Sequence, residues 1–176
     1  MKREEGDVVK PILKGRAHVF GDDINTDYII AGKYTKTLDY KSLASHLFED
    51  LDPEFTKKLL PGDFIVAGRN FGCGSSREQA PIAIKYAGIG AVLARSFSRI
   101  FFRNAINLGL PVFVCDTSNI RAEDPLEIDL KEQVVRNCRT KKTCVVEPLA
   151  PVMMDIINEG GLVPYLKKHK DFNLKK

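Results

Sequence analysis

The stretch Asn70-Phe71-Gly72-Cys73-Gly74-Ser75-Ser76-Arg77-Glu78-Gln79, here called the signature loop, carries the densest chemical pattern in the chain. The apolar segment 63–68 before it is rich in strand formers, and residues 80–87 after it have apolar side chains at helical spacing. The sequence therefore predicts a strand-to-helix turn. The first N–H groups of a helix lack intrahelical partners and lie at the positive end of the helix dipole, so such a turn can bind an anion.

The residue types of the signature loop suit an anionic ligand. Gly72 and Gly74 permit a tight turn and the close approach of a ligand to the backbone. Either Ser75 or Ser76 can cap the following helix through its hydroxyl group. Arg77 offers a planar guanidinium fork that matches a carboxylate or a phosphate. These features together predict a binding site for an acidic small molecule.

The start of the helix and the role of the loop remain open at this level. Ser75 has capping-box spacing to Glu78, but Pro81 would remove an N–H from the helix, which is therefore expected to kink or to begin slightly late. The same Gly/Ser pattern is also typical of a turn that only caps a helix. The loop lacks the Gly-Lys-Ser/Thr ending of a phosphate-binding P-loop, and it does not complete the dinucleotide fingerprint.

Length and composition are those of one globular domain covering residues 1–176. Hydrophobic residues make up 44% of the chain and charged residues 28%, and the net charge of +4 is mild. Much of the basic excess lies in a tail, about residues 167–176, which is expected to be a solvated end.

The beginning of the chain does not resemble a signal peptide, and no stretch approaches a membrane span. A cytoplasmic location is expected.

The cysteines predict no metal site in this chain. Cys73, Cys115, Cys138 and Cys144 are expected to be free thiols in such a protein. Their spacings match neither zinc-binding Cys-x-x-Cys pairs nor the clustered cysteines that hold iron–sulfur centres. Any metal that the protein uses is expected to come from elsewhere.

The order of predicted elements indicates an α/β domain with a mixed sheet. Residues 12–20 are expected to form the first strand, with His18 facing solvent, and residues 28–37 a loop. Strands and helices alternate through residues 63–115, which favours a parallel section covered by helices, whereas the short strands beyond 116 favour antiparallel pairing. The predicted architecture has two layers of β structure with helices packed outside.

Four ordered motifs resemble one known family. The signature loop resembles that of the swivelling domain of the aconitase superfamily, and residues 12–166 resemble the small subunits of the 3-isopropylmalate dehydratases (isopropylmalate isomerases). The resemblance implies a three-layer β/β/α swivelling domain. The motifs are Gly21-Asp22-Asp23-Ile24-Asn25-Thr26-Asp27, Gly72-Cys73-Gly74-Ser75-Ser76-Arg77-Glu78, Ser96-Phe97-Ser98-Arg99-Ile100-Phe101-Phe102-Arg103-Asn104-Ala105 and Gly160-Gly161-Leu162.

The resemblance implies a hydro-lyase that dehydrates and rehydrates 2- or 3-isopropylmalate in leucine biosynthesis. In this family the catalytic site is shared with a large subunit, whose 4Fe-4S cluster acts as the Lewis acid. The chain alone is then expected to bind no cofactor and to be inactive, because it carries half of a site. Its partners would be the large subunit and a hydroxy di- or tricarboxylate substrate.

The resemblance also assigns roles to residues of this chain. Ser75 is implied as the catalytic base, and Ser76 and Arg77 as groups that bind substrate carboxylate. Thr26 and Asp27 match active-site positions, and we count them as substrate-binding residues. The family often has Tyr-Leu-Arg-Thr after this turn, whereas this chain has Tyr34-Thr35-Lys36-Thr37. Lys36 is our candidate for a second substrate carboxylate.

Three alternatives stay open. A small subunit of homoaconitase, or of a citramalate-type or 2,3-dimethylmalate dehydratase, would show the same motifs with a different substrate loop. An RNA-binding module is a second class, but the chain has no basic stripe with interleaved aromatic residues, which argues against nucleic-acid binding. A stand-alone anion-binding domain is the third.

Overall fold

The computed structural model describes residues 11–37 and 39–170. Seven strands form one sheet, in the order β4-β3-β2-β1-β5-β6-β7. The strands are β1 (Ile12–Val19), β2 (Phe64–Ala67), β3 (Ala91–Ala94), β4 (Val112–Val114), β5 (Pro125–Asp129), β6 (Val134–Asn137) and β7 (Thr143–Val145). The helices are α1 (Thr26–Ile29), the 3-10 helix η1 (Gly32–Tyr34), α2 (Tyr40–Ser45), α3 (Phe55–Lys58), α4 (Gln79–Tyr86), α5 (Arg99–Leu108), α6 (Pro151–Asn158) and α7 (Leu162–His169).

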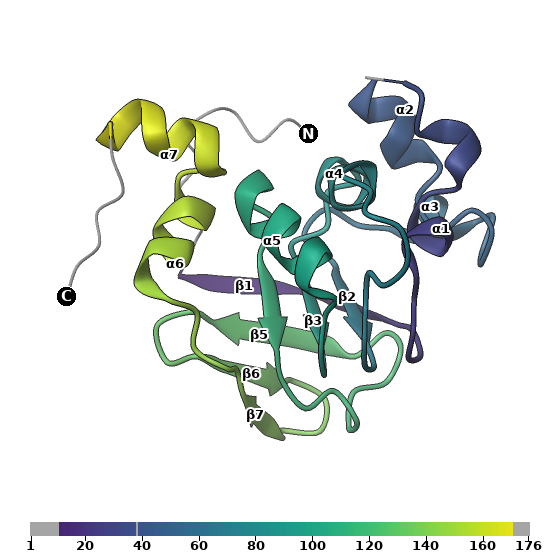
Figure 1. The fold of residues 1–176 in the computed structure, drawn as a ribbon. Coiled ribbons are helices and arrows are strands. Elements are labelled where there is room, and N and C mark those ends of the chain that lie inside the picture. The colour runs from purple at the N-terminus through teal and green to yellow at the C-terminus, as the bar shows by residue number, and fades with distance from the viewer. Residues whose placement is uncertain (1–10, 38, 171–176) are drawn as a thin grey trace.

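Strand β1 divides the sheet into a parallel half and an antiparallel half (Figure 1). It pairs with β2 in parallel, with Ala17 opposite Phe64, and β3 and β4 continue the parallel pairing. Its other edge pairs with β5 in antiparallel register, with Leu13 opposite Ile128, and β6 and β7 follow. The mixed sheet predicted from the sequence is confirmed.

The parallel strands are buried on both faces and therefore separate two hydrophobic cores. Ile65 and Val92 belong to the core on the helix side, where α4, α5, α6 and α7 pack. Phe64 and Leu93, one residue out of phase, belong to a second core together with Ile128 of the antiparallel half. The antiparallel strands therefore cover the face of the parallel half that the helices leave open. This arrangement confirms the expected α/β fold with two layers of β structure and helices packed outside.

Three loops at the carboxyl ends of the parallel strands lie side by side. They are the α1 loop (residues 20–25, after β1), the signature loop after β2, and the α5 loop (residues 95–98, after β3). Phe71 pairs with Phe97, and Asn25 with Cys73, as isolated β-bridges between these loops. Carboxyl ends of parallel strands meet at one edge of the sheet, where ligands commonly bind.

Two local predictions are wrong. His18 is only 7% exposed rather than facing solvent, because β1 lies in the middle of the sheet and Nε2 of His18 lies 2.8 Å from the buried Asp63 carboxylate. Residues 28–37 are not a plain loop, since they contain the end of α1 and all of η1. Helix α1 begins there because the side chain of Asn25 accepts a hydrogen bond from the Tyr28 N–H.

Candidate functional site

Helix α4 begins at Gln79, later than capping by a serine would require. Its N-cap is Glu78, which makes no side-chain capping hydrogen bond, so capping by Ser75 or Ser76 and the capping box are wrong. The late start is confirmed. Pro81 becomes the third residue of the helix, where an N–H has no intrahelical partner to lose. The two serines are therefore left with exposed side chains.

A surface hollow gathers most of the predicted site residues. It is bordered by three parts of the chain: the start of α1, the signature loop and the first turns of α5. Ser75 and Ser76 are exposed in it and Arg77 is partly buried, so both hydroxyl groups lie on an open surface that a partner could cover. Its lining consists of Thr26, Gly72, Gly74, Ser75, Ser76, Arg77, Ser98, Ile100, Phe101 and Asn104.

The helix end that borders the hollow belongs to α5 rather than α4. Ser98 caps α5, since its Oγ accepts from the Phe101 N–H, and the same hydroxyl donates to the Gly72 carbonyl at 2.7 Å. Gly72 has φ +76°, and a Cβ there would lie 2.2 Å from Cγ of Phe101. At Gly72 the group that approaches the backbone closely is therefore a phenylalanine of α5, and the predicted approach of a ligand stays a prediction.

Thr26 and Asp27 each hold part of the signature loop. The Thr26 hydroxyl donates to the Ser75 carbonyl at 2.9 Å, and the Thr26 N–H donates to the Cys73 carbonyl at 2.9 Å. Nη1 of Arg77 lies 2.5 Å from Oδ1 of Asp27 and also donates to the Ile30 carbonyl at 3.4 Å. The serine pair and the guanidinium group are thus oriented from the neighbouring α1 turn.

Lys36 stands apart from the other predicted residues. It is exposed and does not belong to the lining of the hollow. The preceding residue connects its loop to the site, because the Gln79 side chain donates to the Thr35 carbonyl at 3.2 Å. The structure therefore brings together five of the six predicted residues and places Lys36 on an adjoining loop.

Four further residues line the hollow without a site role predicted from the sequence, namely Ser98, Ile100, Phe101 and Asn104. All four lie in the motif at 96–105, so the signal was present in the sequence. What was missing was the packing of α5 against Gly72, which lies 26 residues away from Ser98.

The described residues offer no metal site of their own. Within residues 11–37 and 39–170, no group of three or more His, Cys, Asp or Glu side chains could hold a metal ion. Cys115 and Cys144 are hydrogen-bonded to each other, and this contact together with burial raises the pKa of the Cys115 thiol. This donor set does not fit a 4Fe-4S cluster held by the described part of the chain.

Within residues 11–37 and 39–170, no helix is long and apolar enough to cross a membrane.

Comparisons with known proteins agree with the geometry. Residues 22–115 match the aconitase C-terminal domain family. A relative from Archaeoglobus fulgidus, 3-isopropylmalate dehydratase small subunit 2, is 56% identical over 92% of this chain and 99% of its own length. The methanogen homoaconitase small subunit of Methanocaldococcus jannaschii is 53% identical over 94% of this chain and 97% of its own. A crystal structure of a 3-isopropylmalate dehydratase from M. jannaschii superposes with a TM-score of 0.88 and 53% identity, covering 90% of this chain and 95% of that one.

Proposed function

Because the chain belongs to the family of 3-isopropylmalate dehydratase small subunits, within the aconitase superfamily, we propose that it completes the active site of a two-subunit hydro-lyase. The reaction would interconvert 2- and 3-isopropylmalate for leucine biosynthesis, and the enzyme would work in the cytoplasm. The observation that carries the proposal is the open hollow in which Ser75, Ser76 and Arg77 lie together with both hydroxyl groups exposed.

Ser75 is proposed as the base that removes the proton next to a substrate carboxylate. A serine hydroxyl is a weak base, so its anion needs nearby positive charge and N–H donors. The first turn of α5 and the partly buried Arg77 border the same hollow as Ser75 and are suited to supply both. A helix terminus stabilises such an anion by only about 1–2 kcal/mol. The remaining stabilisation of the Ser75 anion must therefore come from the exclusion of water by a covering partner.

Arg77 is proposed to bind the carboxylate of the substrate, with Ser76 beside it. Asp27 would act through Arg77, because a carboxylate side chain repels a carboxylate substrate but holds a guanidinium group in one orientation. Thr26 donates its hydroxyl proton to the Ser75 carbonyl, so we assign it mainly to holding the signature loop. Direct contact between Thr26 or Asp27 and the substrate stays a prediction.

The large subunit is the proposed source of the 4Fe-4S cluster and of the remaining ligands. When bound there, the cluster would supply Lewis acidity toward a substrate oxygen. This chain would supply the proton acceptor and the carboxylate clamp, and closing the two subunits would exclude water from both. The isolated chain is accordingly proposed to be inactive.

Replacing the base tests the proposal. In enzyme reconstituted with the large subunit, Ser75→Ala is expected to lower kcat by roughly 10²–10⁴, the usual contribution of a general base, with little change in stability. Ser45→Ala, which removes an exposed hydroxyl from α2, is the matched control and is expected to keep wild-type kcat. Near-wild-type turnover by Ser75→Ala would contradict the assignment.

Homoaconitase activity is the second candidate, because the M. jannaschii relative of that name is 53% identical. The two substrates differ in the group that the loop Tyr34-Thr35-Lys36-Thr37 would meet, an isopropyl group or a longer carboxylate arm. Lys36 is proposed to bind a second carboxylate. A panel of hydroxy acids tested with wild type and Lys36→Met decides between them. A preference for the tricarboxylate that Lys36→Met abolishes favours homoaconitase, and a preference for isopropylmalate favours the first proposal.

A further inference from the structure

The signature loop and the α1 loop, which leads directly into Thr26 and Asp27, are joined by a short ladder of backbone hydrogen bonds. The Asp23 N–H donates to the Arg69 carbonyl at 2.8 Å, and the Gly72 N–H donates to the Ile24 carbonyl at 2.7 Å. The Thr26 N–H then donates to the Cys73 carbonyl, one residue before Asp27 on one side and two residues before Ser75 on the other. The relative position of the α1 loop and the signature loop therefore decides where Asp27 holds the Arg77 guanidinium group relative to Ser75.

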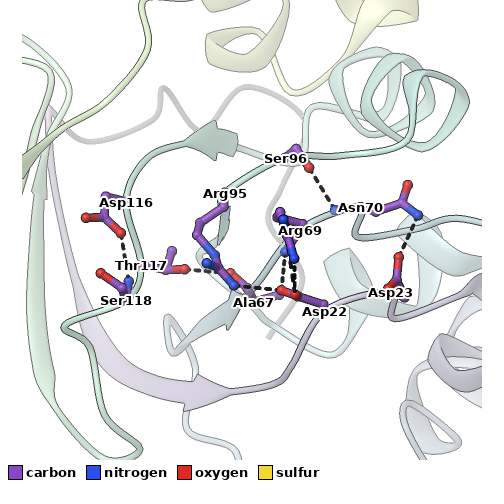
Figure 2. A network of polar contacts seen from close by, with 10 residues as sticks. All are labelled: Asp22, Asp23, Ala67, Arg69, Asn70, Arg95, Ser96, Asp116, Thr117 and Ser118. Carbon is purple, nitrogen blue, oxygen red and sulfur yellow. Dashed lines mark hydrogen bonds and ion pairs between the residues drawn. The ribbon is translucent and has the colours of Figure 1, made fainter.

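At the start of this ladder, Asp23 and Asn70 both adopt left-handed backbone conformations, with φ of +55° and +61°. Asparagine and aspartate tolerate this conformation better than most residues, but two such residues facing each other are uncommon. Their side chains meet, since Nδ2 of Asn70 donates to Oδ1 of Asp23 at 2.8 Å (Figure 2). Both residues are exposed, so this contact adds little to the hydrophobic core.

Asn70 also connects the signature loop to the α5 loop. Its backbone N–H donates to Oγ of Ser96 at 2.8 Å, and the next N–H, of Phe71, donates to the Ser96 carbonyl at 3.0 Å. With its side chain on Asp23 and its backbone on Ser96, Asn70 contacts both neighbouring loops at once (Figure 2). The signature loop, Thr26 directly after the α1 loop, and Ser98 at the end of the α5 loop all line the hollow of the proposed site.

Next to this contact, Asp22 forms an anchor that connects the ends of β2 and β3. Its Oδ1 accepts from the Arg69 N–H at 2.7 Å and from Arg95 at 2.7 Å. The hydrogen bond from the Arg69 N–H is the main reason that the pKa of Asp22 lies below its ordinary value. A Cβ on Gly68 would lie 1.9 Å from the same oxygen, so the carboxylate fits against bare backbone. The Asp23–Asn70 contact is the first side-chain link between this anchor and the site.

We propose that Asp23 and Asn70 are a positioning pair, which sets the position of Asp27 relative to the signature loop and, through Asp27, the place of the Arg77 guanidinium group relative to Ser75. This inference rests on the proposed function, because it concerns the geometry of that site. The pair touches no reacting atom and acts through the backbone ladder. A displacement of about 1 Å between a base and a bound substrate can cost 10²-fold in rate, so a loosened ladder would affect kcat.

A reciprocal exchange tests the pair in enzyme reconstituted with the large subunit. Asn70→Asp sets two carboxylates against each other and is expected to lower kcat roughly tenfold while KM changes less than threefold. The double variant D23N/N70D restores a donor and an acceptor with their places exchanged, and it is expected to recover kcat to within about threefold of wild type. In D23N alone, the amide oxygen of residue 23 can still accept the hydrogen bond from Asn70, so kcat is expected to fall only slightly.

Two further variants separate positioning from folding and from charge. Asn70→Gly keeps the left-handed backbone but removes the side chain, so it is expected to lower kcat with an unchanged or higher Tm. Asn119→Asp adds the same charge at an exposed position away from the hollow and is expected to leave kcat unchanged.

The outcomes are distinguishable from those of the proposed function. Loss of turnover in Asn70→Asp with recovery in the double variant supports the pair. Wild-type kcat in Asn70→Asp, or a double variant as slow as the single one, overturns it. Ser75→Ala measured in the same assay tests the site itself, so an inactive Ser75→Ala beside an unaffected Asn70→Asp refutes only the positioning pair.

Discussion

Arg77 shows how a single residue of the site depends on its neighbours. Its guanidinium group is held by the Asp27 carboxylate at 2.5 Å and by the Ile30 carbonyl at 3.4 Å, and it remains partly exposed to the hollow. A planar group with several N–H donors can keep these two contacts and still present donors to a ligand. A lysine at this position would have a single charged nitrogen with which to contact Asp27, the Ile30 carbonyl and the ligand.

We therefore expect Arg77→Lys to weaken substrate binding although the charge is kept. A lost charge-assisted hydrogen bond is worth about 1.5–3 kcal/mol, so KM is expected to rise roughly tenfold or more, with a smaller fall in kcat. Steady-state kinetics of the reconstituted enzyme measures both values. Arg121→Lys, the same change on an exposed arginine outside the site, is the control. A wild-type KM in Arg77→Lys would show that the substrate does not depend on the guanidinium group of Arg77 for binding.

At the scale of elements, the contact between the signature loop and α5 determines the shape of the hollow. Gly72 combines a left-handed backbone with a position directly against the Phe101 ring. Gly72→Ala is expected to lower the free energy of unfolding by about 2–5 kcal/mol, since backbone strain and overpacking add. Chemical denaturation of the isolated chain measures this.

Two other glycines separate the causes of that loss. Gly160 has φ +83°, but a Cβ added there would meet nothing within 4 Å, so Gly160→Ala is expected to cost only about 1–2 kcal/mol of backbone strain. Gly21 also has open space and no left-handed φ, so Gly21→Ala is expected to be nearly neutral. Equal losses at Gly72 and Gly160 would mean that the contact with Phe101 contributes nothing.

At the scale of the whole molecule, a buried carboxylate helps to hold the antiparallel half. Asp124, just before β5, is only 1% exposed and accepts from Arg139, Asn137 and the Arg121 N–H. The hydrogen bond from Arg139 is the main cause that lowers its pKa from 3.8 to about 2. Because the folded state lowers this pKa, the ionised carboxylate stabilises the fold at neutral pH, and the stabilisation is lost as the pH falls from about 5 toward 2.

Asp124→Asn is accordingly expected to destabilise the chain at pH 7 by roughly 1–2 kcal/mol, a value reduced because the partner Arg139 is half-exposed. The difference from wild type is expected to shrink as the pH is lowered from about 5 to about 2. Urea unfolding at several pH values measures it. Glu54→Gln, which removes an exposed ion pair with Lys57, is expected to change little at any pH. If the difference in unfolding free energy between Asp124→Asn and wild type did not change with pH, ionisation of Asp124 would not stabilise the fold.

Much of this molecule could be predicted from its sequence, because the relevant patterns are local. Apolar runs and helical spacing identified the parallel strands and α5, and the ordered motifs identified the family, which the comparisons confirm. The roles of Ser75, Ser76, Arg77, Thr26, Asp27 and Lys36, the single domain and the cytoplasmic location stay predictions.

Only the tertiary structure decided which residues meet. His18 is buried because β1 lies at the centre of the sheet, and Ser98 borders the hollow because the ends of three parallel strands lie together. Asp23 and Asn70 are 47 residues apart, and neither local pattern indicates the other. Local sequence determines conformations within a few residues, whereas contacts between loops follow from the order of the strands.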